Sequence, residues 1–170
     1  TPAIDTSDLL RAQIVLAVSA LDFYVHEITV LGMLELLGGA RPATSAFEKY
    51  RVSVGAMIAG VPTGTHDWFE ADVRERHSFL SFQQPDKISD AIRLFSDVKL
   101  WPNVATALGQ DDVTVKARLR LIVDRRNKIA HEADLDPSFP DTRWPITDAD
   151  VTGSCLFLSQ TVEAIHSVVV

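Results

Sequence analysis

The sequence lacks the residues on which several common kinds of site depend. Cys155 is the only cysteine, which excludes an internal disulfide and a cysteine-based zinc cage. The chain has neither a glycine-rich phosphate loop nor a serine nucleophile motif. His66 and Asp67 have no further ligand at metal-site spacing, and His77 and His166 are isolated. We therefore expect no metal and no other cofactor. One free cysteine is typical of a reducing compartment, so a cytoplasmic location is expected.

A long apolar run without charges is also missing. The most apolar window covers residues 14–37, and Asp22, His26, Glu27 and Glu35 interrupt it. The interior of a bilayer would penalise these side chains. The window is therefore predicted to be a buried helix of a protein without a membrane span.

The pattern of apolar residues predicts an all-α fold. Strand-type alternation is nowhere sustained, and 170 residues suit one domain covering residues 1–170. We expect a bundle of about five to seven helices. The first should begin after Thr6 or Ser7 and end before Gly38. Its apolar residues recur at steps of three and four, giving a buried stripe of Leu10, Ile14, Ala17, Leu21, Val25 and Ile28.

Capping residues and breakers set the remaining boundaries. Asp111 is a plausible N-cap, and Thr147 with Asp150 has the spacing of a capping box. The patterns predict further helices over residues 44–59, 66–82, 87–98, 101–109, 112–133 and 147–167.

The charge distribution is uneven. The net charge of −7 argues against diffuse binding to nucleic acid, because nonspecific affinity comes from neutralising many phosphates. Thirteen consecutive residues nevertheless hold six cations against Asp124 alone, which predicts a focused basic site on an acidic body. The six cations are Lys116, Arg118, Arg120, Arg125, Arg126 and Lys128.

Arg126, Asn127 and His131 lie near the end of the predicted helix over residues 112–133. Arginine can hold phosphate oxygens through its planar fork, and histidine can exchange a proton near neutral pH. This combination can serve RNA cleavage without a metal. In a regular helix, however, Arg126 and His131 are about 140 degrees apart around the axis, so one helix does not direct both to one phosphate. Alternatively, such cations only complement the negative end of the helix dipole.

The spacing of Arg126, Asn127 and His131 resembles the motif of the HEPN superfamily of helical ribonucleases. The stretches 9–12 and 15–27 look like the first long helix of its RiboL-PSP branch. Together with residues 126–133, they identify that branch as the suspected family. The resemblance implies a two-fold homodimer in which motif helices from both chains line one cleft.

We assign catalysis to His131 as base or acid, Arg126 as the stabiliser of phosphorane charge, and Asn127 as an orienting group. The expected reaction is attack by the ribose 2′-OH on the adjacent phosphorus, leaving a 2′,3′-cyclic phosphate. From the basic cluster, RNA binding is assigned to Lys128, Arg125 and Arg120.

Asp22, His26 and Glu27 are ionisable groups in an otherwise apolar helix. Pairing between Asp22 and His26, four residues apart, is enough to explain two of them. The other interpretation gives all three a supporting role beside the Arg-His cleft, with His26 and Glu27 as the stronger candidates.

The sequence therefore predicts a metal-independent endoribonuclease that acts as a homodimer on RNA. The resemblance implies a toxin-antitoxin or phage-defence setting, with an antitoxin or defence-system protein as a possible partner. Two alternatives stay open, a catalytically inactive HEPN domain that binds RNA or nucleotide and a structural dimerisation module.

Overall fold

The computed structural model of the protein describes residues 6–139 and 141–170. Within these ranges the chain forms eight α-helices and one 3-10 helix, and its only strand-like pairing is an isolated bridge between Leu135 and Arg143. The all-α prediction is confirmed, with one helix more than its upper limit of seven. The helices are α1 (Ser7–Leu37), α2 (Ser45–Glu48), α3 (Val54–Gly60), η1 (Val61–Thr63), α4 (Asp67–His77), α5 (Pro85–Ile92), α6 (Leu100–Ala107), α7 (Asp112–Glu132) and α8 (Asp148–Val169).

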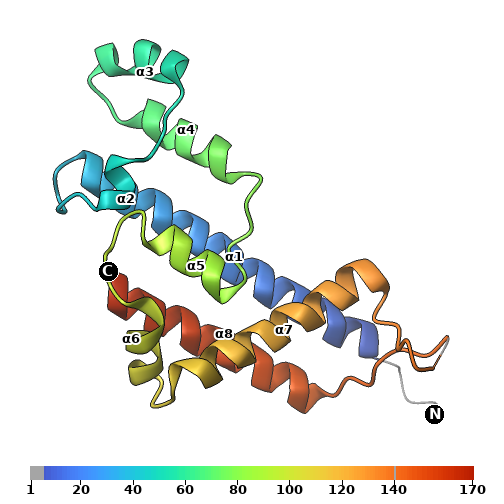
Figure 1. Ribbon diagram of the computed structural model, residues 1–170. Coiled ribbons are helices and arrows are strands. Elements are labelled where there is room, and N and C mark those ends of the chain that lie inside the picture. Colours follow the sequence, from blue (N-terminus) through green and yellow to red (C-terminus); the bar gives the residue numbers. More distant parts are fainter. Residues whose placement is uncertain (1–5, 140) are drawn as a thin grey trace.

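Helix α1 is the spine of the fold and contacts α4, α5, α7 and α8. Figure 1 shows α7 beside the N-terminal part of α1, and α3 and α4 toward its other end. Helix α8 runs along α1, with His166 beside Tyr24 and Val169 beside Arg41. Most of the predicted stripe is buried; only Leu10 and Ala17 are half-exposed. By length and composition α1 could cross a membrane, but here its buried stripe belongs to the core of the bundle.

The helix predicted over residues 44–59 is two helices. Thr44 caps α2 through Phe47 N, and Ser53 caps α3 through Ala56 N. Between them the chain is extended, and the backbone N–H of Ser53 donates to Asp72 of α4 at 2.9 Å. Two local caps and a tertiary contact thus override the weak helical pattern of this β-branched stretch.

Helix α4 ends at His77, five residues before the predicted boundary. Beyond it, Asp22 of α1 accepts a hydrogen bond from Phe82 N at 2.6 Å and another from the Gln83 amide at 3.1 Å. These bonds hold the segment in a non-helical path. Helix α5 then begins two residues earlier than predicted, with Pro85 at its first position, and ends at Ile92.

The two C-terminal helices confirm the predicted caps. Asp111 accepts from Thr114 N at 2.8 Å at the start of α7, and Thr147 with Asp150 forms the full capping box of α8. On α7, Val115, Leu119 and Ile122 are buried as expected, whereas the predicted core residue Ile129 is half-buried. The motif thus lies where α7 leaves the core.

Candidate functional site

Helix α7 remains regular through the whole motif and ends just after it. Ala133 and Asp134 both adopt left-handed backbone conformations, with φ of 51° and 60°. The backbone N–H of Asp134 donates to the Lys128 carbonyl at 3.0 Å, closing the last turn. His131 is therefore in the final turn of a properly capped helix.

Arg126 continues the core-facing side of α7, four residues after the buried Ile122, and its side chain is half-buried. Its Nη1 donates to Oδ1 of Asn127 at 3.0 Å. Its Nε is buried and has no hydrogen-bond partner among the described residues. The guanidinium is thus turned from the core side toward Asn127, with one donor still unsatisfied.

His131 is exposed, and in the described part of the chain no hydrogen bond or ion pair holds its side chain. In a regular helix Asn127 and His131 are about 40 degrees apart, so they share the outer face of α7. One chain therefore brings Arg126 and Asn127 together and places His131 on Asn127's face, but no contact joins Arg126 to His131.

Arg125, predicted to bind RNA, is part of an ion-pair cluster at the end of α7. Asp134 is fully buried, and its Oδ2 accepts from Arg125 Nη2 at 2.8 Å and from Arg11 Nε at 2.7 Å. Arg125 Nη2 also lies 3.3 Å from the Trp144 carbonyl and 3.2 Å from that of Pro145. Through Nη2 this guanidinium joins the end of α7 to the 134–147 loop, while its Nε and Nη1 form no hydrogen bond among the described residues.

The other cations of α7 point in several directions. Lys116 pairs with Asp112, Arg120 lies 3.4 Å from Asp86, and Arg118 is stacked on Phe157. The six cations therefore do not form the single focused basic surface that their spacing predicted. Helical rotation distributes them around α7, and most have partners within the fold.

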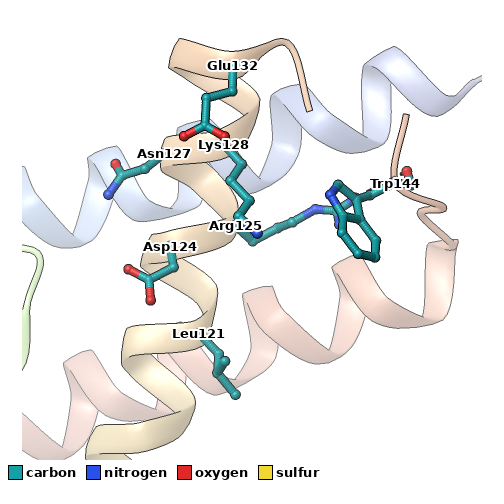
Figure 2. A pocket seen from close by; sticks show the side chains of 7 residues that line it. All are labelled: Leu121, Asp124, Arg125, Asn127, Lys128, Glu132 and Trp144. Carbon is teal, nitrogen blue, oxygen red and sulfur yellow. Dashed lines mark hydrogen bonds between the residues drawn. The ribbon is translucent and has the colours of Figure 1, made fainter. Parts of the chain in front are cut away.

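A pocket of about 550 Å³ opens beside the motif on α7 (Figure 2). Arg126 and His131 are not among its lining residues. Lys128, predicted to bind RNA, is exposed there, and its Nζ lies 5.5 Å from the centre of the Trp144 ring. The lining residues are Leu121, Asp124, Arg125, Asn127, Lys128, Glu132 and Trp144.

The proposed supporting residues Asp22, His26 and Glu27 line a second pocket, of about 330 Å³, between α1 and α4. His26 Nε2 lies 3.9 Å from Asp22 Oδ1. Arg74 donates to Glu27 at 2.5 and 3.0 Å, and these hydrogen bonds hold the pKa of the Glu27 carboxyl below its usual value. The two pockets have no lining residue in common, so one chain does not place these three residues beside the motif.

The segment between α4 and α5 nevertheless connects the two pockets. Phe82 and Gln83 donate to Asp22, while Gln84 donates to Asp124 at 3.3 Å. Asp22 therefore holds a segment whose next residue, Gln84, contacts the motif pocket at Asp124. Its pairing with His26 is only part of its role.

Two residues of these pockets had no clear sequence signal. His77 lies in the second pocket, is buried, and has no partner at Nδ1 among the described residues. Burial, with the nearby His26, lowers the pKa of His77 to about 4. Trp144 was also missed, although an aromatic residue before Pro145 in a loop that follows the motif could have indicated a wall of the site.

Comparison with known proteins fixes the family. The sequence model of RiboL-PSP-HEPN matches residues 3–169, nearly the whole chain. The chain belongs to the RiboL-PSP-HEPN family. No curated protein and no solved structure gives a significant match. Membership supports a nuclease-related or RNA-related function for this HEPN chain, without naming a substrate or establishing catalysis. Among the described residues, no three His, Cys, Asp or Glu side chains are grouped to hold a metal ion.

Proposed function

We propose that this HEPN protein is a metal-independent endoribonuclease whose catalytic groups are Arg126, Asn127 and His131. One observation carries the proposal. At the capped end of α7, Arg126 turns its guanidinium onto Asn127, and the exposed His131, whose side chain has no hydrogen-bond or ion-pair partner among the described residues, shares Asn127's face. A cation, an amide and a proton carrier thus occur together in a family with RNA-related function.

The proposed reaction needs no group beyond these side chains and the RNA. A base removes the proton of the ribose 2′-OH, the 2′ oxygen attacks phosphorus, and the bond from phosphorus to the 5′ oxygen breaks. An acid returns a proton to that leaving oxygen, and a 2′,3′-cyclic phosphate remains. His131 serves as base or acid, which typically contributes about 10² to 10⁴-fold. Arg126 stabilises the charge that develops on the phosphorane.

A two-fold dimer would complete the site. Val113 and His131 are eighteen residues apart, about five helical turns, so they lie on the same outer face of α7. Val113 on this face is exposed by 67%, and Leu121, about 80 degrees away around the helix, is exposed by 70%. Such exposure of large apolar side chains fits a contact between copies. Facing α7 helices would bring the His131 of the partner toward the Arg126–Asn127 pair and would supply two histidines to one cleft.

A catalytically inactive, RNA-binding HEPN domain is the alternative, and one observation favours it. Within one chain Arg126 contacts Asn127 and no contact joins it to the exposed His131, so a single chain does not assemble the catalytic pair. Such a domain would bind RNA without cutting it. A purely structural dimer would do neither.

The decisive experiment is an assay of the purified protein with labelled single-stranded RNA in EDTA. We expect cleavage that leaves 2′,3′-cyclic phosphate ends and that spares a substrate with 2′-deoxyribose at the scissile nucleotide. RNA binding without turnover would instead identify the inactive domain. Cleavage that stops in EDTA would contradict the metal-independent mechanism.

The cellular setting rests on the family alone. We propose that the protein acts in the cytoplasm within a toxin-antitoxin or phage-defence system, restrained by a partner protein. Expression of the chain should slow bacterial growth, and the His131→Ala form should be tolerated. Equal toxicity of the two forms would argue against RNA cleavage as the cause.

A further inference from the structure

Trp144 forms an aromatic wall of the pocket beside the motif. It comes from the 134–147 loop, while the rest of the lining comes from α7 (Figure 2). The pocket volume of about 550 Å³ falls in the range of roughly 300–1,000 Å³ that is typical of small-ligand sites. The Trp144 wall and α7 thus border an open pocket large enough for a planar ligand.

The backbone of Trp144 is held firmly. Its N–H donates to the Asp134 carbonyl at 2.9 Å, and its own carbonyl accepts from Arg11 at 2.8 Å. Asp134 is itself fixed by Arg11 and Arg125. A ring on such a support loses little freedom when a ligand stacks on it, which favours binding.

The charged residues of the pocket are not paired as their spacing would allow. Asp124, Lys128 and Glu132 are four residues apart and follow one face of α7. Lys128 forms no ion pair with either carboxylate in the described residues; its ammonium lies over the Trp144 ring. Among the described residues, the Asp124 carboxylate accepts one hydrogen bond, from the Gln84 amide at 3.3 Å, and the Glu132 side chain has no partner. Two hydrogen-bond acceptors therefore remain available in the pocket.

Carboxylates beside an RNA-cleaving motif repel phosphates, so they do not serve the backbone of the substrate. They suit the donors on the edge of a base, where acidic side chains accept hydrogen bonds from ring N–H and amino groups. Aromatic rings, in turn, provide stacking surfaces for bases. The combination is that of a base-reading pocket.

We propose that this pocket binds a guanine base of the RNA next to the scissile phosphate, stacked on Trp144 and read by Glu132. The proposal rests on the ribonuclease function proposed above. Guanine presents N1–H and the 2-amino group side by side, matching the two oxygens of one carboxylate. Adenine and cytosine offer only one amino group on that edge, and uracil only N3–H. Lys128 leaves the ring when the base arrives and is then free for a neighbouring phosphate, while Asn127 links the pocket to Arg126.

The test is calorimetric titration of the full chain with the four nucleoside 3′-monophosphates, which requires no turnover. Guanosine 3′-monophosphate should bind most tightly. Trp144→Leu should weaken that binding roughly 5- to 150-fold, the loss typical of one stacked base, and Trp144→Phe should keep most of it. Circular dichroism would verify that both variants are folded.

Glu132→Gln is the second variant, and because Glu132 is exposed the fold should tolerate the substitution. It should reduce the affinity for the guanosine nucleotide to the level of the adenosine nucleotide. Glu75→Gln, an exposed glutamate on α4, is the matched control and should change nothing. In parallel, cleavage of a mixed-sequence RNA should occur next to guanines in the unmodified protein and lose that preference in Glu132→Gln.

The outcomes separate this inference from the proposed activity. Guanosine binding through Trp144 without any RNA cleavage would keep the pocket and remove the ribonuclease. Cleavage that depends on His131, with no selective guanosine binding and an unchanged cleavage pattern in Trp144→Leu, would keep the ribonuclease and overturn the pocket. A guanosine preference that survives Glu132→Gln would also overturn the inference.

Discussion

Arg126 and Asn127, adjacent on α7, are joined by a hydrogen bond of 3.0 Å from Nη1 to Oδ1. Neighbours in a helix point about 100 degrees apart, so only a long side chain can make this connection. The bond carries a cation from the core side of α7 to the face that also holds His131. A half-buried arginine thereby becomes a candidate for phosphate binding.

Arg126→Lys should reduce RNA cleavage by at least about 10²-fold, because an ammonium lacks the planar fork that can hold Asn127 and a phosphate oxygen together. Single-turnover rates at saturating RNA would measure this loss. Arg93→Lys, at the exposed arginine that caps the C-terminus of α5, should leave the rate unchanged. A fully active Arg126→Lys protein would argue against phosphate holding by the guanidinium.

His131→Ala should lower the cleavage rate by about 10² to 10⁴-fold, the usual contribution of a placed acid-base group. The free energy of unfolding should change by less than about 0.5 kcal/mol, because His131 is exposed and no hydrogen bond or ion pair holds its side chain in the part of the chain that the structure describes. His66→Ala, at another exposed histidine, is the control and should retain full activity. Comparable losses of cleavage rate in His131→Ala and His66→Ala would argue against a catalytic role for His131.

Asp134→Asn should destabilise the fold by about 3–5 kcal/mol, because it leaves Arg11 and Arg125 without their buried counter-charge. Asparagine tolerates the left-handed backbone of this position, so the loss reports the charge alone. Urea denaturation would measure it. Asp141→Asn is the matched control, since Asp141 is exposed and also left-handed, with φ of 67°. It should shift stability by less than about 0.5 kcal/mol.

The buried His77 should make the fold sensitive to acid. Its pKa is about 4 in the native protein, against an ordinary value of 6.5. Between these values the unfolded chain binds a proton that the native chain does not, so stability present above pH 6.5 is lost as the pH falls toward about 4. The loss should reach up to about 3 kcal/mol. Urea denaturation across this range should show a smaller pH dependence for His77→Gln, whatever its absolute stability; an identical dependence would exclude His77 as the source.

Val113→Glu should separate the proposed dimer, because a two-fold axis would set the two new carboxylates against each other. Sedimentation should show more monomer for Val113→Glu than for the unmodified protein. The specific activity of the unmodified protein should fall on dilution, and RNA should shift its equilibrium back toward dimer. Val54→Glu is the control, at a valine of similar exposure in the first turn of α3. A monomer with full specific activity at every concentration would contradict a site shared between chains.

Local sequence signals predicted much of this fold. The start and end of α1, the Asp111 cap and the Thr147–Asp150 capping box are set by neighbouring residues, and all are present. The predicted helix over residues 44–59 was wrong in its middle, because the Ser53 backbone bonds to Asp72 in another helix. The early end of α4 likewise follows from Asp22 of α1. Where the helical periodicity of the sequence is weak, contacts between distant segments determine the helix boundaries.

The site was predicted less completely. The motif could be located because Arg126, Asn127 and His131 are close in sequence and share one regular helix. The partners of Arg125 could not be predicted. Its partner Asp134 is buried and also pairs with Arg11, which is far away in the sequence. The spacing of the cations in the sequence also suggested one basic surface. In the structure the turn of the helix points these side chains in different directions around α7, and several of them pair with carboxylates. The catalytic roles themselves stay predictions until the substitutions above are measured.

The contact between Arg11 and Asp134 spans 123 positions of the chain. During synthesis the buried arginine of the first helix can meet this carboxylate only after the residues between them have emerged from the ribosome. The end of α7 and the Trp144 wall therefore cannot be assembled before residue 144 has been made. Under the proposed function, this order of events would keep the site of a growing chain incomplete while the first six helices are being synthesised.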